Sequence, residues 1–108
     1  MPIFMTQFAY TVEGWKSLTR NPEDRSVPLR ALIDKLGGKL LNIYYSFGDY
    51  DGVVIMEAPD AQTVVTALLA IVNAGHVSSL KTSQLFTTQE GMEAMAKANK
   101  IVYPAPKG

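Results

Sequence analysis

The chain has 108 residues, a length typical of one domain with one modest hydrophobic core. Ten basic and ten acidic side chains give a formal net charge of zero, so no long-range field attracts a nucleic acid or an anionic membrane. Cysteine is absent, which excludes disulfides, thiolate nucleophiles and cysteine-ligated metals.

The first part of the chain reads as a strand followed by two helices. Residues 3–10 are rich in β-forming residues and predict a strand, and Thr11 is a suitable N-cap for a short helix. The polar segment 19–28 contains two prolines and interrupts the pattern. Apolar residues at helical spacing in 29–36 then predict a second helix, which ends at Gly37.

The middle of the chain predicts a β-hairpin and a helix. Residues 39–47 and 51–58 are apolar and flank a turn bounded by Gly48 and Gly52. Asp60 is the expected N-cap of the helix that follows. This helix has an apolar surface wider than a single stripe, so we expect it to be covered on more than one side. The apolar residues are Val64, Val65, Leu68, Leu69, Ile71 and Val72.

The last part of the chain predicts a strand, a helix and a tail. Residues 76–87 read as a fourth strand, and Thr88 is the expected N-cap of a terminal helix. Residues 101–108 contain two prolines and cannot continue that helix. We therefore expect residues 1–108 to form a single domain, with 101–108 as an extended C-terminal tail.

The order strand, helix, strand, strand, helix, strand is typical of the α+β class, and specifically of the ferredoxin-like split βαβ plan with an added C-terminal helix. Both faces of the hairpin strands carry apolar residues, whereas helices cover only one face of such a sheet. The other face therefore needs a second layer, and another copy of the same chain is the simplest one. The sequence predicts self-association through the sheet.

Three segments carry a family resemblance: FMTQFAYTVEGWKSL, LGGKLLNIYYSFGDYDGVVIMEAPD and LKTSQLFT. Together they resemble the GYD domain family, named for a Gly-Tyr-Asp signature at the hairpin. Here the signature reads Gly48-Asp49-Tyr50-Asp51, with one residue inserted before the tyrosine. The resemblance spans about residues 3–98. It implies a small α+β domain related in shape to the dimeric α/β-barrel proteins, and it implies no particular reaction.

The turn with Asp49 and Asp51 is interpreted as structural. If successive strands simply alternate in direction, this turn and His76 lie at opposite ends of the sheet, roughly 27 Å apart, so neither aspartate pairs with His76. As metal ligands the two aspartates lack the further acidic positions of a calcium loop. We therefore expect no metal and no organic cofactor.

A ligand pocket is expected at the end of the sheet where the first strand delivers Tyr10. Trp15 on the next helix and His76 at the start of the fourth strand belong to the same end, and Tyr44 joins them only if it faces the helices. His76 is the candidate catalytic residue, because it titrates near neutral pH. The alternatives are that His76 caps a strand end and that the aromatic residues belong to the core or an interface. The mixed-charge segment from Arg20 to Arg25 is either a solvated loop or a lid.

Two functions remain open. The first is a noncatalytic oligomeric module that binds a small apolar or aromatic ligand or a partner. The second is a cofactor-free enzyme, of monooxygenase or isomerase type, acting on a small aromatic or quinone-like molecule. Phosphate-binding, dinucleotide, zinc-protease and nucleophile-elbow motifs are all absent from the sequence. We expect a cytoplasmic protein, because the N-terminus lacks the features of a signal peptide and no apolar run is long enough for a membrane.

Overall fold

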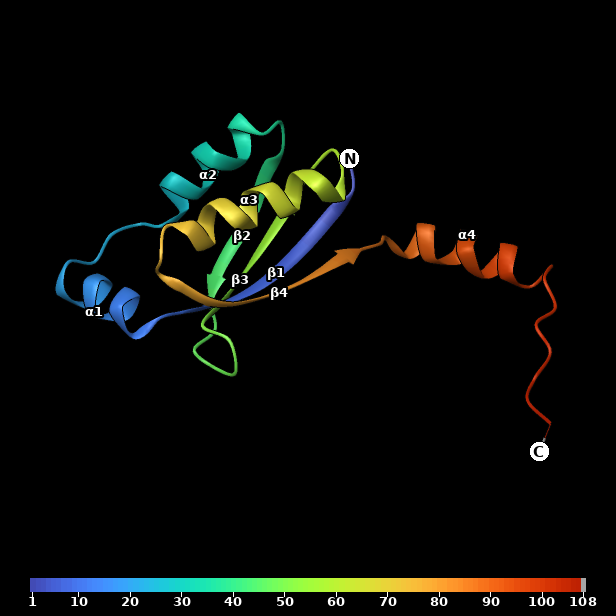
Figure 1. Ribbon diagram of the computed structural model, residues 1–108. Coiled ribbons are helices and arrows are strands. Elements are labelled where there is room, and N and C mark those ends of the chain that lie inside the picture. Colours follow the sequence, from blue (N-terminus) through green and yellow to red (C-terminus); the bar gives the residue numbers. More distant parts are fainter. Residues whose placement is uncertain (108) are drawn as a thin grey trace.

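The computed structural model describes residues 1–107 and confirms the α+β class. An antiparallel four-stranded sheet has the strand order β2-β3-β1-β4, as the ferredoxin-like plan requires (Figure 1). In chain order the elements are β1 (Ile3–Tyr10), α1 (Val12–Arg20), α2 (Ser26–Lys35), β2 (Lys39–Tyr45), β3 (Gly52–Glu57), α3 (Ala61–Asn73), β4 (Val77–Leu85) and α4 (Thr88–Ala98). Residues 101–107 form neither helix nor strand, and Gly108 lies outside the described residues.

Short polar side chains set where the helices begin. The Thr11 hydroxyl accepts a hydrogen bond from the amide of Gly14 at 3.0 Å, and α1 follows directly. The cap of α4 is Thr87 rather than the expected Thr88. Its hydroxyl accepts from the amide of Glu90 while the Glu90 carboxylate accepts from the amide of Thr87, a reciprocal pair that only this spacing permits.

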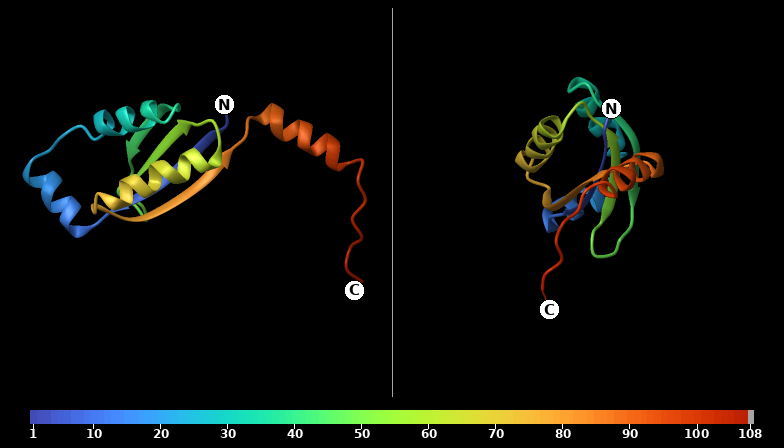
Figure 2. Two further views of the ribbon diagram at one scale, coloured as in Figure 1. Left: turned by 45° about the horizontal axis from the view of Figure 1, so that its top comes forward. Right: turned by 90° about the vertical axis from the view of Figure 1, so that its right-hand side faces the viewer.

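The hydrophobic core lies between one face of the sheet and the helices α2 and α3 (Figure 2). Buried side chains alternate along β1 and β3, as on a sheet with one covered face. Thr6 is the buried polar exception, and its hydroxyl bonds that of Thr82 at 2.8 Å. The buried apolar residues of the core cluster are Phe4, Phe8, Ile33, Leu40, Val54, Met56, Ala58 and Val64.

A β-bulge between Leu40 and Asn42 changes which residues of β2 face the helices. After the bulge, Tyr45 pairs with Gly52 and lies on the helix-covered face, as does Ile43. Tyr44 points to the open face, where its hydroxyl accepts a hydrogen bond from the side-chain Nδ2 of Asn42. Simple alternation from residue 39 therefore does not hold along this strand.

Helix α4 and the residues after it extend away from the rest of the chain (Figure 1). The radius of gyration is 17.7 Å, whereas a compact chain of this length has about 13 Å. Apart from Gly91, all residues of α4 are exposed. The chain's own core therefore does not cover this helix.

Candidate functional site

One end of the sheet brings together the end of β1, the β2–β3 hairpin and the start of β4. Phe8 of β1 pairs with Gly52 at the start of β3 and with Leu80 of β4. The expectation that the hairpin turn and His76 lie at opposite ends is therefore wrong. The segment containing α1 and α2 carries the chain back along the sheet, so β1 and β2 run in the same direction and the hairpin lies beside the end of β1.

Asp51 connects the segments at this end of the sheet through hydrogen bonds. Its Oδ2 atom accepts hydrogen bonds from the backbone amide of Tyr10 at 2.8 Å and from the indole Nε1 of Trp15 at 3.1 Å. Its own amide donates to the carbonyl of Phe8 at 2.8 Å, and its carbonyl accepts from the amide of Ser46. Asp51 thus connects the hairpin to β1 and α1, which is a structural role, as the sequence interpretation of the turn proposed.

Close approach to two glycines fixes the neighbouring segments. A Cβ atom on Gly52 would lie 2.4 Å from the ring of Phe8, and one on Gly14 would lie 2.7 Å from the carbonyl oxygen of His76. Both distances are shorter than real Cβ contacts, so a side chain at either position would displace its neighbour. The same His76 carbonyl accepts a hydrogen bond from the Thr11 amide at 2.9 Å, which places His76 beside the start of α1.

Five aromatic side chains form a continuous group at this end of the sheet, here called the aromatic cluster: Phe8, Tyr10, Trp15, Tyr45 and Phe47. Tyr10 packs edge-to-face against Trp15 with ring centroids 5.0 Å apart, and Tyr45 stacks on Phe47 at 5.5 Å. Phe47 is 70% exposed and has a φ of 51°, a conformation that side chains other than glycine rarely adopt. The cluster therefore runs from the core to the surface.

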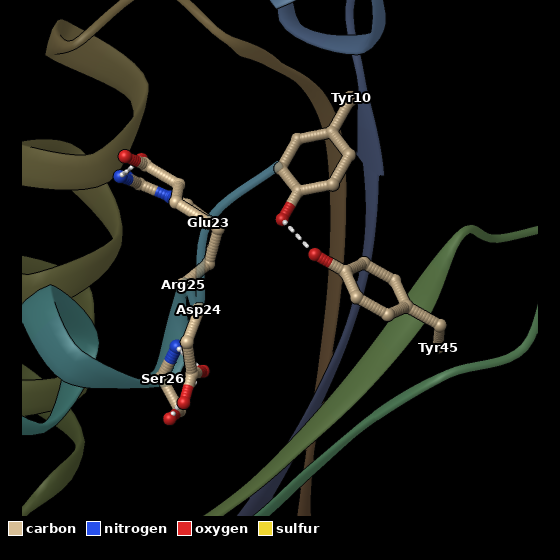
Figure 3. A network of polar contacts seen from close by, with 6 residues as sticks. All are labelled: Tyr10, Glu23, Asp24, Arg25, Ser26 and Tyr45. Atoms are coloured by element: carbon tan, nitrogen blue, oxygen red, sulfur yellow. Dashed lines mark hydrogen bonds and ion pairs between the residues drawn. The ribbon is translucent and has the colours of Figure 1, made fainter. Parts of the chain in front are cut away.

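The hydroxyls of Tyr10 and Tyr45 point toward one another and share a hydrogen bond of 3.3 Å (Figure 3). Burial, followed by this hydrogen bond, raises the pKa of Tyr10 well above its ordinary value. Tyr10 is therefore a neutral hydrogen-bond donor and acceptor throughout the physiological pH range.

A cavity of about 300 Å³ lies between the sheet and the helices α2 and α3, next to the aromatic cluster. Its volume is at the lower end of the range for small-molecule sites. Most of its wall is apolar, with side chains such as Leu32, Ile43, Val54, Leu68 and Leu80. The polar lining residues are Thr6, Tyr10, Arg25 and His76.

The structure brings three of the four expected site residues to this region. Tyr10 and His76 line the cavity, and Trp15 packs on the ring of Tyr10. The side chain of His76 is exposed, so it lies at the rim. Tyr44 is 57% exposed on the open face of the sheet, and Tyr45 occupies the position next to Tyr10 in its place.

Sequence reasoning did not place Tyr45 in this region, and it did not foresee that Asp51 contacts Tyr10 and Trp15. The face of the sheet on which Tyr45 lies depends on the bulge, and the residue pattern of β2 does not reveal that bulge. Predicting that Asp51 contacts Tyr10 and Trp15 required the correct strand directions. The mixed-charge segment did indicate Arg25, since a lid was one of its two interpretations, and Arg25 lines the cavity. The Arg25 guanidinium also forms an ion pair with Glu23 at 2.6 Å, and the carboxylate of the adjacent Asp24 accepts hydrogen bonds from the backbone amide and the hydroxyl of Ser26 (Figure 3).

Residues 1–107 contain neither a metal-binding cluster of side chains nor a helix that could span a membrane. Within residues 1–107, no group of three or more His, Cys, Asp or Glu side chains is arranged to hold a metal ion. None of the helices formed by these residues has the length and apolar character needed to cross a membrane.

Comparisons with known proteins identify a family and a fold. The GYD domain model matches residues 4–95. A protein of Thermus thermophilus, described as glutamine synthetase and cystathionine beta-lyase binding protein, is 32% identical over 80 residues, which are 74% of this chain and 84% of that protein. The crystal structure of MtbAldR superposes with a TM-score of 0.54 at 14% identity, covering 80% of this chain. This chain spans about half, 52%, of that structure, and the likeness shows the fold alone.

Proposed function

The chain belongs to the GYD domain family, as its sequence segments indicated, and we propose that it is a noncatalytic binding module that self-associates and holds a partner protein. The observation that carries the proposal is the group of apolar side chains exposed on α4 and the following tail. The description of the Thermus thermophilus relative supports the class of partner. We therefore propose glutamine synthetase or cystathionine beta-lyase as the partner, and a cytoplasmic location.

The exposed apolar surface of α4 suits a protein partner. Met92 and Met95 lie on one side of the helix and are 60% and 71% exposed. Ile101, Val102 and Tyr103 continue this apolar character along the tail and are more exposed still. Methionine side chains are flexible and polarizable, which favours contact with a surface of irregular shape. Helix α4 thus offers a projecting apolar element that no part of the chain's own core covers.

Self-association is proposed through the open face of the sheet. Met5, Val53 and Ile55 lie on this face, because their neighbours along each strand are buried against the helices. Tyr44 adds an exposed aromatic ring. Two such faces packed together would remove these side chains from water, as in the dimeric α/β-barrel-like assembly that the family resemblance implies.

A binding measurement tests the partner proposal. Glutamine synthetase and cystathionine beta-lyase from the organism that encodes this chain are immobilised. The binding of the purified chain to each enzyme is measured by surface plasmon resonance. We expect one of them to bind the chain and Met95→Glu to weaken binding by about tenfold or more, because the charge would be buried in an apolar contact.

Ala94→Glu is the matched control, since it places the same charge on a different side of α4, about 100° around the helix from Met95. Binding of neither enzyme would overturn the partner assignment. Equal weakening by both substitutions would show that the apolar side of α4 is not the contact surface.

A further inference from the structure

The cavity between the sheet and α2 and α3 has the size of a small molecule. Water occupies roughly 30 Å³ per molecule in the liquid. At that share, the cavity of about 300 Å³ has room for about ten non-hydrogen atoms. Its walls include Ile43, Leu68 and Leu80, which favour an apolar ligand body.

The charge on the wall of the cavity is positive. Arg25 carries a positive charge, whereas no aspartate or glutamate among residues 1–107 lines this cavity. A cation at the rim without an acidic lining residue favours an anionic group on the ligand. A guanidinium presents two parallel N–H donors that match a carboxylate in particular.

The present partner of Arg25 is easily replaced. The side chains of Arg25 and Glu23 are 41% and 54% exposed, and an ion pair this exposed contributes little stability. A ligand carboxylate that approaches from the cavity can therefore take the place of the Glu23 carboxylate.

Tyr10 supplies a second donor at the rim. The Tyr10 and Tyr45 hydroxyls share one hydrogen bond, in which either can be the donor. When Tyr45 donates to Tyr10, the Tyr10 proton is free for a ligand oxygen.

We propose that this cavity binds a small monocarboxylate with an apolar tail of about seven carbon atoms, its carboxylate on Arg25 and the Tyr10 hydroxyl and its tail among Ile43, Leu68 and Leu80. The ligand is a free small molecule. This site is separate from α4, so the inference does not depend on the partner-protein proposal.

Octanoate is the probe, because it has about the number of non-hydrogen atoms that the cavity holds. Octan-1-ol, which has the same tail and no charge, is the comparison ligand. Calorimetry measures affinity and stoichiometry. The fluorescence of Trp15, the chain's one tryptophan, reports binding at the site because its ring packs on Tyr10. We expect one octanoate per chain, bound at least about tenfold more tightly than octan-1-ol.

Arg25→Gln tests the position of the carboxylate, with Arg20→Gln as the matched control on α1, away from the cavity lining. We expect Arg25→Gln to weaken octanoate by about tenfold and to leave octan-1-ol unchanged, whereas Arg20→Gln changes neither. Tyr10→Phe, which keeps the ring, should weaken octanoate by several-fold. Circular dichroism and thermal melting verify that each variant is folded.

Three outcomes would overturn the proposal. Wild-type protein that binds no octanoate would remove the site. Equal affinities for octanoate and octan-1-ol would remove the anion preference. Octanoate binding that Arg25→Gln and Arg20→Gln affect equally would place the ligand elsewhere, for example on the exposed apolar side of α4. The first two results do not bear on the binding of a partner enzyme.

Discussion

The Oδ2 atom of Asp51 lies 3.1 Å from the indole Nε1 of Trp15, 36 positions earlier in the chain. The same carboxylate oxygen accepts a hydrogen bond from the backbone amide of Tyr10. One side chain of the hairpin turn therefore fixes the end of β1 and the first turn of α1, and through Trp15 it orients the aromatic cluster beside the cavity.

Asp51→Ala is expected to destabilise the fold. The substitution leaves the Tyr10 amide and the Trp15 indole without their acceptor, which costs about 1–3 kcal/mol in the free energy of unfolding. The measurement is urea unfolding followed by circular dichroism.

Asp49→Ala is the matched control, because Asp49 is exposed and its side chain makes no hydrogen bond with residues 1–107. We expect it to stay within about 0.5 kcal/mol of the wild type. Equal effects of the two substitutions would contradict the assigned role of Asp51.

The sequence predicted the elements well because local signals specify them. Thr11 and Asp60 cap helices as expected, and β1 has the predicted bounds. Strand direction is a property of the whole chain, and the expectation failed there because it ignored the return path through α1 and α2. The bulge at Leu40 exchanged the roles of Tyr44 and Tyr45 through one extra residue, which the alternation of apolar residues did not indicate.

Tyr10 is expected to make stability fall at high pH. Its pKa is raised above the ordinary 10.0, so between the unfolded and folded pKa values the folded chain keeps a proton that the unfolded chain releases. The stability from Tyr10 is thus complete below about pH 10 and is lost as pH rises through the folded pKa.

Urea unfolding between about pH 9 and pH 11 measures this dependence. Tyr10→Phe should reduce the loss of stability with pH, whereas Tyr103→Phe, at a residue that is 90% exposed, should not. Identical pH dependence in the Tyr10→Phe variant and the wild type would contradict the assignment.

Ile55→Lys is expected to break self-association. Ile55 lies on the open face of the sheet, and a lysine there would place a charge within the proposed interface. Size exclusion with light scattering should give at least a dimer for the wild type and a smaller species for this variant. Ser17→Lys, on the exposed side of α1, is the control and should leave the mass unchanged. A monomeric wild type at micromolar concentration would refute the proposed dimer.

His76→Ala separates the binding module from the cofactor-free enzyme. The His76 side chain is exposed, so we expect the free energy of unfolding to change by less than about 0.5 kcal/mol. Octanoate affinity should fall less than in Arg25→Gln, and partner binding through α4 should not change. Turnover of a phenolic or quinone-like substrate that is present in the wild type and lost in folded His76→Ala would favour the enzyme instead.

Phe47 allows a test of whether the exposed end of the aromatic cluster is strained. Its φ of 51° lies in the left-handed region, which costs roughly 1 kcal/mol for a residue with a Cβ atom. Phe47→Ala removes the ring but keeps this cost, whereas Phe47→Gly removes both. The Phe47→Gly variant should therefore have a free energy of unfolding about 1 kcal/mol higher than the Phe47→Ala variant. This is the reverse of the order of glycine and alanine in regular helices and strands. Urea unfolding of the two variants measures the difference, and an alanine variant as stable as the glycine variant would show that this backbone conformation relaxes without the ring. In that case the packing on Tyr45 and Trp15 would be what holds Phe47 in place, since those two rings are its neighbours in the cluster.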